Sequence, residues 1–256
     1  VEETGGKRGY TEGSPGDRPA LDQKTIRRLK GNEEKDMIKL RTIEERYGPA
    51  LKKAREDFRL VEPYTAAYCS DTTYREITAT TGLFEVPFWG QTCLVRYPDG
   101  EVRDGYTGEG LPIITQILVL HYLTHADGTP MADRWVAFRE LPGGLGYDPA
   151  FQGRADHRLV RAFGHDLEGF IRAAEALGGE RITFGDAAFL FRIFPRLWMA
   201  AILYLADEEF GASASVLFDG AADHYLPTED LAVLGGLLAS RLIKEARENS
   251  DSPKVS

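Results

Sequence analysis

Apolar residues recur at spacings of three and four between residues 33 and 58, which predicts an amphipathic helix over this segment. The apolar positions of this helix are Met37, Leu40, Ile43, Tyr47, Leu51, Ala54 and Phe58. Asn32 stands at the position where a capping side chain is favoured. Gly48-Pro49 is expected to kink the helix or to divide it in two.

From Gly82 onward the pattern changes to β-branched and aromatic residues, which predicts strands. Residues 83–106 are expected to form a hairpin that turns at Pro98-Asp99-Gly100. Further strands are expected over 133–141, over two runs between 187 and 207 that are divided at Pro195, and over 214–219.

The remaining periodic segments predict helices over 111–126, 154–163, 166–177 and from Thr228, at the cap position, to about 248. Helices and strands do not alternate strictly, so the order favours the α+β class, with a mixed, largely antiparallel sheet and packed helices. The first twenty residues are rich in Gly, Pro and charge. We therefore expect a disordered or partly helical tail over 1–32 and a single α+β domain over 33–248.

The charge and the length of the apolar runs exclude several classes of partner. The chain of 256 residues carries a net charge of -9, which argues against binding to nucleic acids or to anionic membranes. No apolar run reaches the roughly 18–20 residues that span a bilayer. The start of the chain, VEETGGKRGY, lacks the apolar stretch of a secretion signal, so a cytoplasmic location is expected.

The two cysteines, Cys69 and Cys93, are too few for an iron–sulfur cluster or a structural zinc site, which usually take four ligands. Their spacing does not support a disulfide. Free thiols that are buried are the favoured interpretation.

His121 and His125 lie four residues apart in QILVLHYLTH, so both side chains are expected on one side of a helix. This spacing can place two imidazoles on one metal ion, but Tyr122 stands where a zinc protease of this pattern has its glutamate. His121 shares its helical phase with Ile114, Ile117 and Leu118, which predicts a buried His121 and a His125 at the helix end. A hydrogen-bonded core histidine and a ligand inside an apolar pocket both remain open for His121.

The stretch WVAFRELPGGLGY has adjacent charges at Arg139 and Glu140, and glycines at Gly143 and Gly144 that permit close backbone approach to another group. On a strand the two charged side chains would point to opposite faces. The glycines match neither the dinucleotide fingerprint nor the phosphate-binding loop, and a tight connection explains them equally well.

Acidic residues follow the apolar run that ends near residue 206, beginning with Asp207, Glu208 and Glu209. Together with His224 these side chains could hold a divalent ion. Ion pairing between the acidic stretch 207–230 and the arginine-rich segment 154–196 is the alternative. A calcium-binding loop has no support, because the acids lack the regular alternation of an EF-hand.

The motifs LHYL, WVAFRELPGG..Y...F, FPRLWMAAILYLADEEF and LFDGAADHYLPTEDL, in this order, resemble domain-of-unknown-function family 3786 of anaerobic bacteria and archaea. The resemblance covers roughly residues 35–245 and implies a link to corrinoid-dependent one-carbon metabolism. Some members of the family carry a cysteine-rich module that this chain lacks. The positions that the resemblance emphasises are His121, Arg139, Glu140, Gly143, Gly144, Asp207, Glu209, Phe210, Asp219 and Asp230.

The leading hypothesis is a cofactor-binding protein that holds a corrinoid (cobalamin-like) or related tetrapyrrole, with haem or a divalent metal as alternatives. The residues expected at the cofactor are His121, Arg139, Glu140, Gly143, Gly144 and Tyr147. A second hypothesis is a metal-dependent enzyme, and the ligands expected for its ion are His121, Asp207, Glu208, Glu209 and His224. A third is a non-catalytic protein whose acidic surface meets a basic protein partner.

Overall fold

The computed structural model describes residues 42–251. By contacts between Cα atoms the chain divides into residues 1–46 and residues 47–256, and the fold described here belongs to the second unit, apart from the start of the first helix. The tail predicted over 1–32 and the start of the helix predicted at residue 33 lie outside the described residues. Within 42–251, no helix is both long and apolar enough to cross a membrane.

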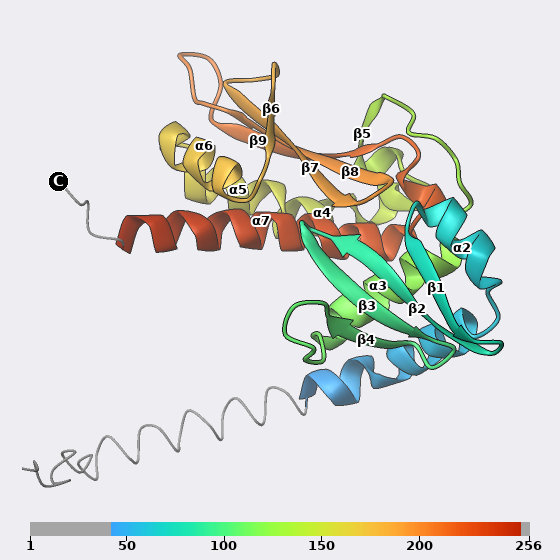
Figure 1. The fold of residues 1–256 in the computed structure, drawn as a ribbon. Helices are drawn as coiled ribbons and strands as arrows, with labels where there is room; N and C mark the ends of the chain where they lie inside the picture. Colours follow the sequence, from blue (N-terminus) through green and yellow to red (C-terminus); the bar gives the residue numbers. More distant parts are fainter. Residues whose placement is uncertain (1–41, 252–256) are drawn as a thin grey trace, which may run out of the picture. The chain divides into compact units, whose positions relative to one another are not determined.

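Helices and strands follow one another in the order shown in Figure 1. A helix over 42–58 is followed by α2 (Pro63–Ser70), β1 (Thr73–Thr78), β2 (Thr81–Phe88), β3 (Gln91–Tyr97), β4 (Glu101–Asp104), α3 (Ile113–His125), β5 (Trp135–Ala137), the 3-10 helices η1 (Phe138–Glu140) and η2 (Gly144–Tyr147), α4 (Asp148–Arg154), α5 (Asp156–Phe163), α6 (Leu167–Ala176), β6 (Glu180–Ile182), β7 (Ala187–Phe194), β8 (Leu197–Tyr204), β9 (Ser213–Asp219), the 3-10 helix η3 (Ala222–His224) and α7 (Thr228–Asp251).

The helix over 42–58 is not divided at Gly48-Pro49. Ala54 and Phe58 are buried and Leu51 packs against the core, so the apolar positions predicted for the second half of this helix are confirmed. The helix therefore contributes one face to the core.

The first sheet is an antiparallel meander in the order β1-β2-β3-β4. Along β2, Phe84, Val86 and Phe88 are buried while alternate residues are not, which is the alternation of a sheet with one covered face. The turn at Pro98-Asp99-Gly100 joins β3 to β4 as predicted, and Gly100 has a φ of 66°, a conformation that glycine adopts without strain.

The second sheet has the order β5-β9-β8-β7-β6, and each of its pairings is antiparallel. β7 and β8 are separated at Pro195, as predicted. Helices α5, α6 and α7 lie along one side of this sheet in Figure 1. The α+β class is confirmed, with the strands divided between two antiparallel sheets rather than gathered in one.

The strand predicted over 133–141 is wrong for most of its length. Strand β5 pairs with β9 over three residues only, from Trp135 to Ala137. The chain then closes into η1, where the Glu140 carboxylate accepts the backbone N–H of Ala137 at 2.8 Å. This local hydrogen bond offers the backbone an alternative to the sheet ladder, which the apolar pattern alone could not show.

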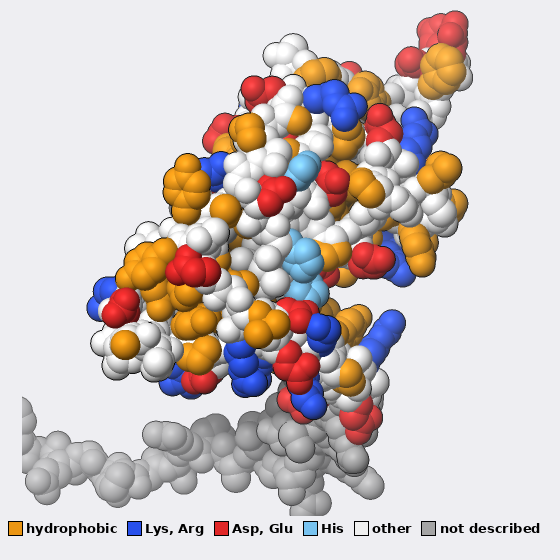
Figure 2. Space-filling model, turned by 90° about the vertical axis from the view of Figure 1, so that its right-hand side faces the viewer, with side chains coloured by type: hydrophobic (Ala, Val, Ile, Leu, Met, Phe, Trp, Pro, Cys, Tyr) orange, Lys and Arg blue, Asp and Glu red, His pale blue; other side chains and the backbone are white. Residues whose placement is uncertain are grey.

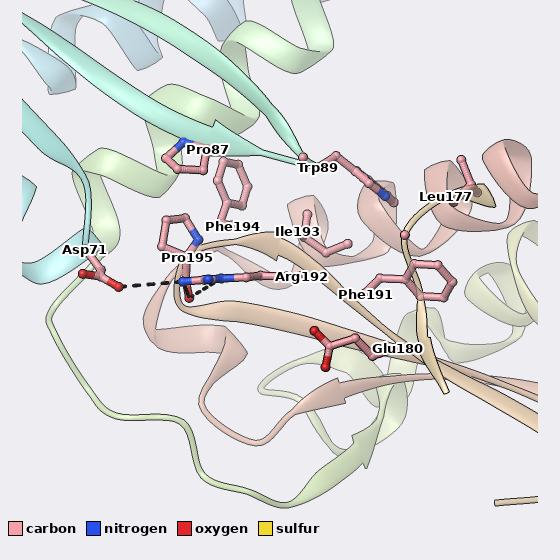
Figure 3. A pocket seen from close by; sticks show the side chains of 12 residues that line it. Asp71, Pro87, Trp89, Leu177, Glu180, Phe191, Arg192, Ile193, Phe194 and Pro195 are labelled. Atoms are coloured by element: carbon pink, nitrogen blue, oxygen red, sulfur yellow. Dashed lines mark hydrogen bonds and ion pairs between the residues drawn. The ribbon is translucent and has the colours of Figure 1, made fainter. Parts of the chain in front are cut away.

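The turn between β2 and β3 connects the two sheets. The N–H of Trp89, at the tip of this hairpin, donates to the carbonyl of Ile193 on β7 at 2.8 Å. A cavity of about 370 Å³ lies beside this contact, with Trp89, Arg192 and Pro195 among its walls (Figure 3). The Arg192 guanidinium donates to the carbonyl of Pro195 and lies 3.9 Å from the Asp71 carboxylate, so the cation of this cavity already has protein partners.

Candidate functional site

The carboxyl end of α3 and the start of α7 bring His121 and Asp230 into contact. The Nδ1 atom of His121 lies 2.5 Å from Oδ2 of Asp230, although the two residues are 109 positions apart in the sequence. The side chains are 22% and 14% exposed, so the contact lies at the edge of the core and reaches the surface. Since the carboxylate occupies Nδ1, Nε2 is the ring nitrogen that faces away from it, and it has no hydrogen-bond partner among the described residues.

His121 is half-buried rather than buried, which corrects the prediction from helical phase. Helix α3 is buried around most of its circumference; its buried residues are Ile117, Leu118, Val119, Leu120, Tyr122 and Leu123. A helix covered on several sides has no single inward stripe, so sharing a phase with apolar residues did not place His121 in the core. Tyr122 occupies the core instead.

His125 lies one turn after His121, and its Nδ1 atom is 2.9 Å from the backbone carbonyl oxygen of His121. The two imidazole rings meet edge to face, with centroids 5.5 Å apart. Histidine side chains gather near the middle of the face shown in Figure 2, with acidic side chains beside them. His125 is exposed and has no carboxylate partner among the described residues, unlike His121.

A second pair forms where the loop after α3 meets η3. Nδ1 of His224 lies 2.7 Å from Oδ2 of Asp127, and 3.1 Å from the hydroxyl of Thr129. The hydrogen bond to His224 lowers the pKa of Asp127 to about 2, and the same contact raises the pKa of His224. Both side chains are almost half exposed, at 44% and 48%, so solvent screens the attraction and its effect on folding is small.

Asp127 and Thr129 were not expected among the residues of a site. Both lie in a polar turn directly after α3, and nothing in that turn indicates that His224, 97 positions away from Asp127, would be its partner. Asp-Gly-Thr is typical of a loop, so the pattern predicts the turn and not the pairing.

The buried carboxylate of Asp219 stabilises the same loop from the protein interior. This carboxylate is 1% exposed, and its Oδ1 atom accepts the backbone N–H groups of Ala132 and Ala221 at 3.0 and 2.9 Å. It thereby ties the loop before β5 to the turn that leads into η3. Asp219, which the family resemblance emphasised, positions the loop that carries Asp127 and does not itself reach the surface.

The residues between Arg139 and Tyr147 that were predicted at the cofactor lie in two different environments. Arg139 and Glu140 lie on η1 with exposed side chains, so the expectation that they point to opposite faces of a strand is wrong. Gly143 and Tyr147 instead border a cavity of about 300 Å³ that is also lined by Thr228 and Glu229, at the start of α7. The structure thus brings Gly143 and Tyr147 to the same end of α7 that carries Asp230.

Gly144 has a structural reason to be glycine. A Cβ atom added there would clash with the backbone carbonyl oxygen of Phe138, whereas nothing lies within 4 Å of the corresponding position at Gly146. We expect Gly144→Ala to reduce the free energy of unfolding by about 1–3 kcal/mol, because the backbone must shift to make room. Denaturant unfolding would measure this loss. Gly146→Ala is the matched control and should change stability by less than about 0.5 kcal/mol; equal effects in the two variants would contradict the packing argument.

The acidic stretch does not assemble into an ion site. Asp207, Glu208 and Glu209 are exposed on the loop between β8 and β9, where the Asp207 carboxylate accepts the N–H groups of Glu209 and Phe210. These backbone hydrogen bonds lower the pKa of Asp207. Over the described part of the chain, no three His, Cys, Asp or Glu side chains are grouped so that they could hold a metal ion.

The predicted ion pairing between stretch 207–230 and segment 154–196 is also absent within residues 42–251. The acids of the stretch that have partners are bound otherwise: Asp219 to backbone N–H groups and Asp230 to His121. The arginines of segment 154–196 are therefore left with other neighbours or with solvent.

Both cysteines are free, as predicted, but only Cys93 is buried and Cys69 is partly exposed. Cys93 is buried in the first sheet, and burial raises the pKa of its thiol to about 12. A thiol that stays protonated at neutral pH is a poor nucleophile, so Cys93 is a packing residue.

Comparison with known proteins addresses the family. A model described as a domain of unknown function (DUF3786) matches residues 63–241. The chain belongs to this family. No curated protein and no solved structure matches the chain.

The segment matched by the DUF3786 model contains both histidine–carboxylate pairs. It spans α3 with His121, the loop with Asp127, and the start of α7 with Asp230. Two residues that the resemblance emphasised independently, His121 and Asp230, are in direct contact. Within the family segment, this pair is the strongest candidate for a functional site.

Proposed function

We propose that the protein binds a tetrapyrrole-type cofactor, a corrinoid in the first place, with His121 as the protein ligand to its metal. The observation that carries this proposal is the hydrogen bond between His121 Nδ1 and the Asp230 carboxylate. A metal-ligating histidine almost always donates its other ring N–H to a carboxylate, a carbonyl or water, which sets the tautomer and orients the ring. Here that arrangement leaves Nε2 as the ligating atom.

The number of donors favours a macrocyclic cofactor over a free ion. A free divalent ion needs three or more protein ligands, and no group of three lies together within the described residues. A tetrapyrrole brings its own equatorial nitrogen ligands, so one oriented imidazole is sufficient on the protein side. The His121–Asp230 pair can therefore serve a tetrapyrrole metal, which needs one protein ligand, but not a free divalent ion, which needs three or more.

The first turn of α7, which carries Asp230, also borders an apolar cavity of about 300 Å³, although neither His121 nor Asp230 lines it. The walls of this cavity include Phe138, Tyr147 and Phe151. Apolar contact area with a few polar anchors is what such a cofactor requires. When bound, the metal centre would supply group-transfer chemistry, while Asp230 holds the proton on Nδ1 and makes Nε2 a stronger donor.

Titration of the purified protein with hydroxocobalamin, with haem in a parallel series, tests the proposal through the absorption spectrum. We expect a saturable spectral change that His121→Ala abolishes. Asp230→Asn should weaken binding by about 10–100-fold, because the ligand loses the carboxylate that orients it. His165→Ala is the matched control, because it removes an exposed histidine that does not contact His121, and it should bind as the wild type does.

The proposal fails if neither cofactor changes its spectrum with the wild-type protein, or if the change survives in His121→Ala. Circular dichroism of each variant before titration shows that the fold is intact. A spectral change with haem alone would identify a haem protein and would contradict the corrinoid assignment.

The alternatives from the sequence have less support. A metal-dependent enzyme built on Asp207, Glu208, Glu209 and His224 would need side chains that the structure leaves apart, since His224 pairs with Asp127. An acidic surface that meets a basic protein partner remains a prediction for the exposed loop that begins at Asp207. The cytoplasmic location and the anaerobic host likewise remain predictions.

A further inference from the structure

A basic groove lies between α5 and the second half of α7, away from the His121–Asp230 pair along the chain. Its volume is about 490 Å³. Its lining is cationic and partly apolar: Arg158, Arg161, Lys244 and Arg247, with Ala162, Ser240, Ile243 and Glu248. We call it the α5–α7 groove.

The cations of the α5–α7 groove are only partly paired. The Arg158 guanidinium donates to the Ser240 hydroxyl at 2.9 Å, which orients it along the groove. Lys244 lies 3.5 Å from Glu248, but both side chains are well exposed, at 75% and 58%, so this pair is weak. Among the described residues, Arg161 and Arg247 have no hydrogen bond or ion pair that would offset their positive charges in the groove.

Such a concentration of positive charge does not follow from the composition, because the chain has a net charge of -9. The acidic stretch 207–230, which was expected to pair with segment 154–196, forms no ion pair with Arg158 or Arg161, and its buried Asp219 and its Asp230 are bound to other groups. Four cations around one groove repel one another, and an anionic ligand would relieve that repulsion. Arg192 differs from these arginines, because its guanidinium donates to the carbonyl of Pro195 and lies near the Asp71 carboxylate.

We propose that the α5–α7 groove binds a nucleoside polyphosphate. Arginine forks match phosphate oxygens in two-point geometry, and Arg158, Arg161 and Arg247 provide three of them. The volume is in the range of small-molecule sites, roughly 300–1,000 Å³, and exceeds what a single phosphate fills. Ile243 and Ala162 offer an apolar wall for the base or sugar.

The groove shares helix α7 with the His121–Asp230 pair but none of its residues, so binding at the two places can be tested separately. Isothermal titration calorimetry of the full chain with ATP, pyrophosphate and adenosine, at low ionic strength and without added metal, tests it. We expect saturable binding of ATP, weaker binding of pyrophosphate and none of adenosine. ATP binding should weaken as salt is added, because screening reduces the attraction between exposed charges.

The double variant Arg161→Ala/Arg247→Ala should bind ATP at least about tenfold more weakly, since each lost charged hydrogen bond contributes more than a neutral one. Arg59→Ala/Arg75→Ala is the matched control: it removes two exposed arginines outside the groove, changes the net charge equally and should leave binding unchanged. Absence of ATP binding to the wild type, equal losses in the two double variants, or binding of adenosine as tight as that of ATP would each overturn the proposal.

Discussion

The Tyr122→Ala variant is expected to lose about 3–5 kcal/mol of its free energy of unfolding, the range for truncating a large buried ring. Tyr122 is fully buried, and its ring stacks on Phe194 with centroids 4.1 Å apart. Its hydroxyl donates to the carbonyl of Ser70 at 2.7 Å and accepts the N–H of Arg196 at 3.1 Å. One side chain therefore joins α2, α3 and the β7–β8 turn, and its removal leaves both a cavity and unpaired backbone groups.

Denaturant unfolding of two further variants separates the two contributions. Tyr122→Phe keeps the stacked ring and removes only the hydroxyl, so a loss of about 1–3 kcal/mol is expected from the unpaired groups. Tyr68→Ala is the control for removing a tyrosine; this side chain is 79% exposed, and its removal should change stability by less than about 0.5 kcal/mol. A Tyr122→Ala effect as small as that of Tyr68→Ala would refute the bridging role.

The Asp156→Asn variant is expected to be more stable than the wild type at pH 7 by about 2–3 kcal/mol, from the size of the shift in its pKa. Burial raises the pKa of Asp156 from 3.8 to about 6, and the nearby Asp148 adds to the effect. The Oδ1 atom accepts the N–H of Val216 at 2.9 Å, and the asparagine oxygen can accept the same hydrogen bond. The substitution thus removes a buried charge and keeps its hydrogen bond.

The sign of the pH dependence follows from proton binding. Between pH 3.8 and about 6 the folded protein holds a proton on Asp156 that the unfolded chain has lost, so stability falls as pH rises through this window. Asp156→Asn should therefore match the wild type near pH 3.5 and exceed it above pH 6. Asp133→Asn, at an exposed position, should show no such divergence. The free energy of unfolding in urea should be measured for each protein across this pH range. Parallel pH dependences for the wild type and Asp156→Asn would contradict a raised pKa of Asp156.

Structural elements that are set by residues adjacent in the sequence were predicted correctly. Gly100 adopts the positive φ that the hairpin turn needs, and Pro195 separates two strands because it cannot donate to a ladder. The short helices α2 and α4 were missed, although each carries a local signal. Pro63 and Pro149 stand at the first turn of these helices, each directly after an acidic residue, and the Glu62 carboxylate caps α2 by accepting the N–H groups of Tyr64 and Thr65.

For the candidate site, the sequence allowed predictions about single residues but not about which residues are in contact. His121 was singled out correctly as unusual, but its partner Asp230 was assigned to the first turn of a helix and to an acidic stretch. The acids at 207–209 were assigned with His224 to one ion site, but in the described residues no such group forms and His224 pairs with Asp127. Strand β9 lies between these acids and His224 in the chain, so the two groups lie beyond opposite ends of that strand.

The sequence by itself determined the α+β class, the hairpin turn at Pro98-Asp99-Gly100, the free thiols and the extent of most long helices. These features follow from side-chain periodicity and from turn geometry, which act over a few residues. Only the tertiary structure decided that the strands form two sheets, that His121 meets Asp230, and that the arginines of α5 face α7 instead of the acidic stretch. Each of these depends on how helices pack over long sequence separations, and a hydrogen bond between residues 109 positions apart leaves no local pattern from which it could be predicted.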